Sequence, residues 1–358
     1  MVLYLMRIDL HKKLLCKSTS LIFGLVMLLF LPEYAKSQQS DTTKKGLDYI
    51  SYYLLYRNHD SSYIKNYSDK ISVKLVSMNK YNYFKIRDRN NKSTLKYRPV
   101  RDVSIGLGVA YKWFALDLTL NLGLRNNSDF DNTRSFDFQG SMFSSKQYVS
   151  FTIQYYQAYQ LVSLNGVDEA LAEEIKRRED IRTMNIGIQY MFAVNYTRFS
   201  IKAPFVQNEG QRKSAGSPII GASFNMFVMD ADSSIVPDEV SDAFDPELRI
   251  RDLNILSVSA SLGYMYSFVY KKRFFLTFSF IPGLNINAGD YYTVDRNYNS
   301  ASINLKVNSL NAIGYNSSRF FTGFQFLADA YFSQMEKKLS AEIGHGKLSF
   351  FVGYRFGS

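Results

Sequence analysis

The sequence predicts an all-β fold, a transmembrane antiparallel β-barrel that follows a cleaved signal peptide. Every second residue of 114–124 is large and apolar, and the residues between are small or polar. In a strand these two sets face opposite sides of the sheet. The chain also begins with an export-like segment and contains 28 Phe and 27 Tyr, residues that barrels place at both membrane interfaces. These patterns favour apolar side chains that face lipid.

The N-terminus is typical of an exported protein. A basic region at 7–17 precedes the apolar stretch 21–31, which is short for a membrane helix. Small residues then lead to an expected cut after Ser37; a retained N-terminal anchor is the alternative. The only cysteine, Cys16, would leave with the signal peptide, so disulfides, Cys-ligated zinc and thiol catalysis are excluded from the mature chain.

Three parts follow from this division of the chain. Residues 1–37 are the predicted signal peptide, residues 38–69 a polar periplasmic lead-in segment, and residues 70–358 the outer-membrane β-barrel. The lead-in segment is a candidate plug for the lumen, a point that its residues do not decide.

Alternating segments recur along the predicted barrel, and the count should be even in a bacterial single-chain barrel. Short turns at 112–113, 195–196 and 271–272 should lie on one side of the membrane, so an even number of strands should separate them. Three strands separate the second and third turns, which places one error within 198–252. We therefore expect about 12 strands, with 14 as the alternative. The thirteen candidates are 70–87, 95–111, 114–124, 136–143, 148–157, 184–193, 198–206, 218–229, 253–267, 274–286, 303–312, 320–331 and 347–356.

The connections alternate between short turns and long polar loops, as in outer-membrane barrels. In one loop, residues 167–182 are rich in Glu and Arg at helical spacing, such as Glu173 with Arg177, which predicts a short solvated helix. The expected long loops are 125–134, 158–183, 230–252, 287–302 and 332–346.

Outer-membrane lipids are the first expected partner. The barrel insertion machinery is the second expected partner. The amphipathic segment 347–356 ends in the aromatic Phe356 and resembles the signal that this machinery reads. The net charge of +11 indicates anionic headgroups or an anion-attracting lumen, and no nucleic acid, because an exported chain rarely meets any. The sequence does not determine the oligomeric state.

No catalytic constellation is found, and we expect neither a metal nor a cofactor. Outside the signal peptide the only histidines are His59 and His345. Ser349, the nearest hydroxyl in sequence to His345, would lie about 13 Å away along a strand, too far for a Ser–His pair. The chain is therefore predicted not to be an enzyme.

The most unusual polar run joins two apolar segments at 207–217. Its side chains could form a lumen-facing cluster that binds an anion or gates a pore; an ordinary charged loop is the alternative. The cluster consists of Glu209, Gln211, Arg212, Lys213, Ser214 and Ser217.

The same run carries a family resemblance. Together with 190–200 it resembles the bacterial domain of unknown function 4421 family, over about 45–357. The resemblance implies an exported outer-membrane barrel of a Gram-negative cell with no established activity, and it adds no catalytic residues. Further matching segments are 60–64, 104–113, 263–264, 268–269 and 351–356.

The predicted function is that of a non-enzymatic outer-membrane channel or structural component. A lipid-modifying enzyme of the outer membrane is the alternative, and a soluble exported β-barrel binding protein is a second.

Overall fold

The computed structural model describes one compact unit, a β-barrel, within residues 54–358. The predicted signal peptide and all but the last part of the lead-in segment lie outside the described residues. Among the described residues, no helix is long and apolar enough to cross a membrane. The described ranges are 59–99, 103–111, 114–121, 134–144, 146–165, 177–293, 296–334 and 339–357.

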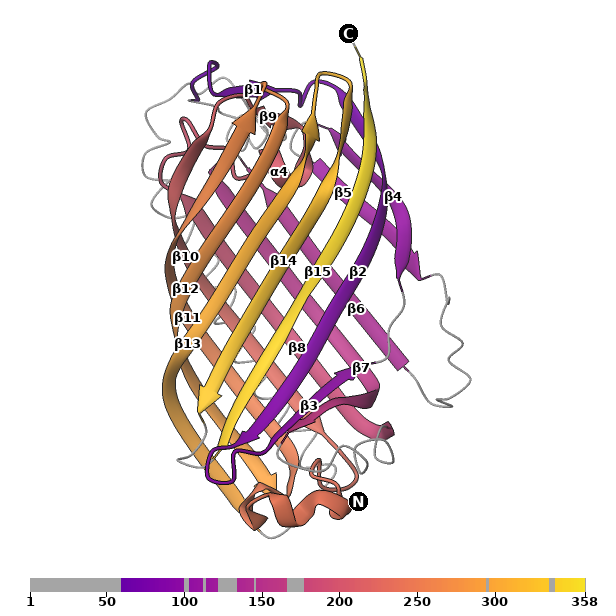
Figure 1. Cartoon of the computed structure of the whole chain (residues 1–358), viewed down its shortest axis with the longest axis vertical. Coiled ribbons are helices and arrows are strands. Elements are labelled where there is room, and N and C mark those ends of the chain that lie inside the picture. The colour runs from indigo at the N-terminus through magenta and orange to yellow at the C-terminus, as the bar shows by residue number, and fades with distance from the viewer. Residues whose placement is uncertain are drawn as a thin grey trace, which may run out of the picture. The chain divides into compact units, whose positions relative to one another are not determined.

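Ten antiparallel strands pair in a closed ring (Figure 1). The all-β antiparallel barrel is thus confirmed. The ring has ten strands, however, where 12 or 14 were expected. The ring closes where the last strand pairs with the first. In ring order the strands are β2 (Ile71–Asp88), β3 (Thr94–Pro99), β7 (Gln147–Asn165), β8 (Arg177–Ala193), β10 (Ala215–Asp230), β11 (Ile250–Tyr270), β12 (Phe274–Thr293), β13 (Asn297–Asn316), β14 (Phe320–Gln334) and β15 (Leu339–Phe356).

The ring has fewer strands than expected because the second part of the predicted strand 95–111 and the next two strands lie outside it. The first part of 95–111, β3, pairs with both β2 and β7 and closes the ring near one end. The second part, β4 (Ser104–Tyr111), pairs with the other half of β2, and β5 (Phe114–Asn121) pairs with β4. In the same half, β6 (Arg134–Phe143) pairs with β7. Within their described residues β5 and β6 share no backbone pairing, so a seam lies between them.

The two ends of the barrel differ. The turn end carries the short connections 271–273 and 317–319, and the loop end carries the connection 231–249. Residues 198–206 at the turn end form a turn and the helix α4 (Ala203–Val206) in place of the predicted strand, because β8 stops at Ala193. This corrects the odd strand count.

The segment 194–214 forms a turn-end cap. After α4, its strand β9 (Glu209–Gln211) pairs with β1 (Ile64–Asn66), which belongs to the predicted lead-in segment. At the loop end, η2 (Asp238–Ala243) and η3 (Pro246–Leu248) lie within 231–249. Residues 177–182, predicted as the end of a helix, are instead the first residues of strand β8. The rest of that predicted helix lies outside the described residues.

The interior of the barrel has three layers. An apolar cluster at the loop end combines Phe84 and Tyr97 with Ile235 and Phe244 of the loop 231–249. A second apolar cluster at the turn end includes Phe199, Ile201 and Phe205 of the cap. Between them the inward side chains are polar: Ser257 Oγ of β11, for example, donates a hydrogen bond to Asn287 Oδ1 of β12 at 2.7 Å.

The outward face is apolar. Leu107 on β4, Leu262 on β11, Phe278 on β12 and Ile303 on β13 are each at least 60% exposed. Water would penalise so much exposed apolar surface, whereas lipid tails would not. The barrel is therefore apolar outside and polar at mid-depth inside, the reverse of a soluble fold.

Candidate functional site

A hollow of about 670 Å³, the wall pocket, lies at the seam between β5 and β6. Inward-facing Asp117 and outward-facing Leu118 of β5 both line it, and so do Asp137 and Phe138 of β6. Neighbouring residues of one strand face opposite sides of a sheet. A single hollow that contacts both sets therefore reaches described residues of the inner face and of the outer face of the wall.

Three lysines point into the wall pocket. Lys74 Nζ of β2 pairs with Asp117 Oδ2 at 3.0 Å, and Lys80 Nζ pairs with Asp137 Oδ1 at 3.3 Å. Lys347 of β15 lies directly opposite Lys80 in the strand register. Its ammonium forms no ion pair or hydrogen bond with any described residue. Among the described residues that line the pocket, three lysines face two carboxylates, an excess of one positive charge.

The Asp137 carboxylate has a structural role. Its carboxylate also accepts hydrogen bonds from Gln154 Nε2 at 3.1 Å, from Gln139 Nε2 at 3.4 Å and from the Tyr156 hydroxyl. The side chain is only 2% exposed, and its bonds tie β6 to the polar layer. The free charge of the pocket therefore belongs to Lys347.

Gly108 of β4 makes the Lys74–Asp117 pair possible. A Cβ at this position would lie 2.2 Å from Asp117 Oδ1 and 2.4 Å from Lys74 Cε. The two side chains cross over β4 through the space that glycine leaves. A residue with no side chain is thus required between two charged groups on non-adjacent strands.

The polar layer behind the pocket continues across the barrel. Gln154 Oε1 accepts hydrogen bonds from Asn82 Nδ2 at 3.1 Å and Asn185 Nδ2 at 3.0 Å. His345, expected in a loop, lies within β15, where its Nε2 is 3.5 Å from Asp329 Oδ2. No hydrogen bond joins Ser349 Oγ to His345 within the described structure.

The six residues of the predicted lumen cluster divide into two groups. Glu209, Gln211 and Ser217 are buried. Ser200 Oγ donates a hydrogen bond to Glu209 at 2.5 Å, Gln211 Nε2 donates to Arg198 O at 2.6 Å, and Ser217 Oγ accepts from Asn195 N at 2.8 Å. These three side chains hold the turn-end cap together.

The other three residues lie toward the surface of the turn end. Lys213 and Ser214 are exposed and Arg212 is half-buried. Lys213 Nζ donates to Ser62 Oγ at 3.2 Å, and Ser214 Oγ accepts from Val269 N at 2.8 Å. None of the six lines the wall pocket.

Sequence reasoning missed the wall pocket. Lys74 was visible as a charged residue on the polar side of 70–75, but Lys80, Asp137 and Lys347 lie far apart in the chain. Only the seam, which no local pattern encodes, brings them together.

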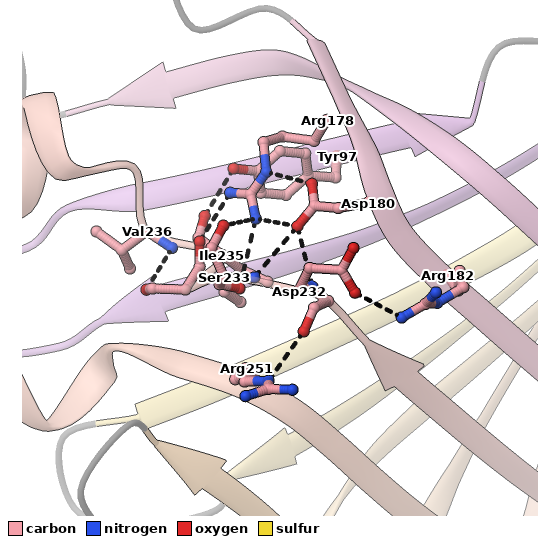
Figure 2. Close-up of polar contacts among 11 residues, drawn as sticks. Tyr97, Arg178, Asp180, Arg182, Asp232, Ser233, Ile235, Val236 and Arg251 are labelled. Carbon is pink, nitrogen blue, oxygen red and sulfur yellow. Dashed lines mark hydrogen bonds and ion pairs between the residues drawn. The ribbon is translucent and has the colours of Figure 1, made fainter. Parts of the chain in front are cut away.

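The loop end is held by a separate polar clamp, which Figure 2 shows. Arg178 donates to Ser234 O at 2.8 Å and to Asp180 Oδ1 at 2.8 Å, and Tyr97 OH donates to Ile235 O at 2.7 Å. Asp180 Oδ2 accepts from the backbone N of Asp232 at 3.1 Å. This clamp fixes 231–249 over the loop end.

The clamp also sets the charge of Asp180, which precedes the outward apolar residues of β8. Partial burial opposes ionisation of Asp180, but the hydrogen bonds and charge of Arg178 outweigh it, so the pKa of Asp180 lies below its usual value. The carboxylate is the form that the clamp requires.

The family described as Domain of unknown function (DUF4421) matches residues 58–356. The chain belongs to the DUF4421 family. The expected family is thereby confirmed. No curated protein matches this DUF4421 chain.

Three solved structures resemble the DUF4421 barrel at low identity. The protease OmpT from Escherichia coli has 9% identity and a TM-score of 0.38, covering 82% of this chain and 98% of its own. Ail of Yersinia pestis has 8% identity and a TM-score of 0.23, covering 80% and 99%. OprG from Pseudomonas aeruginosa has 9% identity and a TM-score of 0.22, covering 82% and 99%.

Proposed function

We propose that this protein is a non-enzymatic outer-membrane barrel that takes an anionic amphiphile from the surrounding membrane into its wall pocket. The observation that carries the proposal is the unpartnered Lys347 in a pocket that reaches both faces of the wall. The outward apolar face and the export-like residues 1–37 support the outer-membrane location.

The pocket suits a ligand with two chemically different parts. Leu118, Leu120, Phe138 and Met142 supply an apolar outer rim for a hydrocarbon chain. Lys347 supplies a cation for a carboxylate or phosphate, and such charge-assisted contacts are strong. The volume also falls in the range of small-molecule sites.

A route along the barrel axis is less favoured than a route through the wall. The apolar clusters at the two ends each combine strand residues with a folded connection. An ion entering there would have to displace packed side chains, whereas at the seam the described residues of β5 and β6 form no backbone pairs with each other. This arrangement favours lateral entry over a simple channel.

The position of His345 inside the barrel wall does not favour catalysis. Its ring lies against Tyr331 and its Nε2 faces Asp329, and no described group of three or more acidic, His or Cys side chains could hold a metal. The alternative, a lipid-modifying enzyme, predicts lipase activity that His345→Ala removes.

The test uses the full mature chain purified from outer membranes. A mobility shift between boiled and unboiled gel samples shows that the purified protein is a folded barrel. A fluorescent fatty acid should bind, and Lys347→Gln should weaken binding at least tenfold. The matched control is Lys85→Gln, since Lys85 lies on β2 but pairs outward with Glu342 at 3.5 Å. An unchanged affinity in Lys347→Gln, or no binding to the wild type, would overturn the proposal.

A further inference from the structure

A second hollow, of about 610 Å³, lies at the turn end and is distinct from the wall pocket. We call it the turn-end hollow. Cations reach it from three separate segments: Lys65 from β1, Arg212 from the residue after β9, and Lys271, Lys272 and Arg273 from the β11–β12 turn. None of the described residues that line it is an Asp or Glu.

These five cations are not neutralised within the described structure. None of them forms an ion pair with a described carboxylate. Lys65 and Lys271 lie over the rings of Tyr67 and Tyr270, at 5.4 and 5.2 Å, and Arg273 donates to the Tyr315 hydroxyl at 3.4 Å. Like charges gathered in one concavity repel each other and attract an anion.

The backbone of the β11–β12 turn is strained at two of these lysines. Lys271 and Lys272 have φ values of 49° and 59°, positive at both central positions, as in a type I′ turn. Asn-Gly is the usual choice there, and a lysine in the left-handed region is strained. Folding alone therefore does not favour two lysines at this turn.

A buried arginine holds two residues that line the turn-end hollow, Tyr67 and Asn316. Arg355 is 1% exposed, and its guanidinium lies 4.3 Å from the Tyr67 ring and 4.5 Å from the Phe321 ring. Its Nη2 donates to Asn316 Oδ1 at 2.7 Å and also contacts the backbone oxygen of Gln207. The cap and the β13–β14 turn are thus locked together beneath the five cations.

The side of the hollow is aromatic. Phe274 and Tyr315 line it with ring centroids 5.0 Å apart, and Phe274 is half exposed on the outward face. Aromatic rings at a strand end mark the membrane interface. The hollow therefore lies where lipid headgroups meet the barrel rim.

We infer that the turn-end hollow binds the phosphate headgroup of an anionic phospholipid, whose acyl chains lie along Phe274 and Tyr315. The cations meet the phosphate and the aromatic rim meets the hydrocarbon. The site rests on the proposed membrane location but shares no residue with the wall pocket, so it does not depend on the ligand proposed for that pocket.

The test places the full chain in phosphatidylcholine nanodiscs with a trace of fluorescent phosphatidylglycerol. The double variant Lys271→Asn/Lys272→Gly should bind the labelled lipid at least tenfold more weakly. Its thermal midpoint should stay equal or rise, because the new residues suit positive φ. The matched control is Lys92→Asn, which removes another left-handed lysine, with φ 58°, from the loop end.

The outcomes separate the possible ligands. Loss of lipid binding in the double variant but not in Lys92→Asn would support the inference. Equal loss in both variants would indicate a general charge effect and overturn it. Inorganic phosphate that binds the detergent-solubilised chain at micromolar concentration and displaces the lipid would show that the ligand is a free phosphate, and would overturn the lipid assignment.

Discussion

Lys80 and Asp137 form an ion pair, 3.3 Å between Nζ and Oδ1, that joins β2 to β6 although these strands are not hydrogen-bonded neighbours. The Lys80 ammonium also reaches Asp137 O at 3.1 Å. Two contacts from one side chain therefore span the region where β3 ends and the seam begins. The barrel wall is held at this point by side chains in place of backbone pairing.

Asp137→Asn should destabilise the barrel by about 3 kcal/mol, because it leaves Lys80 without its charge partner in a buried place. The midpoint of the boiled-to-unboiled mobility transition should fall accordingly. Asp117→Asn is the control: Asp117 is 32% exposed, and we expect a loss of less than about 1 kcal/mol. Equal effects would contradict the anchoring role of Asp137.

Gly106→Ala should be more damaging than Gly108→Ala. A Cβ at position 106 would lie 1.8 Å from the backbone oxygen of Leu118, whereas at position 108 it would meet movable side-chain atoms. The first change should therefore separate β5 from β4, and the second only displace the Lys74–Asp117 pair. Hydrogen exchange over 104–121 measures this, with fast exchange expected in Gly106→Ala alone.

Low pH should release the loop-end connection 231–249. Because the pKa of Asp180 is lowered in the fold, its stabilising effect is complete above the unfolded value of about 4 and is lost as pH falls through the folded value. A spin label at Asp242→Cys should be immobile at pH 7 and become mobile below about pH 4. With Asp180→Asn added, the label should be mobile throughout; a label that stays immobile would exclude the clamp.

Planar bilayers containing the wild-type chain should show no stable single-channel current, because packed connections fill both ends of the barrel. Replacing 198–212 and 232–248 with flexible linkers together should produce current, whereas either replacement alone should not. Steady current through the wild type would restore the simple channel as the leading function.

The alternation of apolar residues determined much of the fold by sequence alone. In β15, Leu348, Phe350 and Phe356 are exposed, while Ser349 and Arg355 are buried, as the period of two requires. The same reasoning placed the turn at 271–272 correctly. It failed at 198–206, where a short apolar run is α4 and cap, because periodicity cannot distinguish a strand from a buried helical turn.

The candidate sites depended on tertiary structure. The sequence placed Arg212 in a polar run. It did not show that Arg212 lies in one hollow with Lys65 and Lys271. The wall pocket needed more: β3 had to end and β4 to begin within one alternating segment, and β5 and β6 share no backbone pairing with each other within their described residues. Local pattern therefore determined which face of each strand is apolar, and only long-range strand pairing decided where Lys80, Asp137 and Lys347 converge, because register joins residues that no sequence spacing relates.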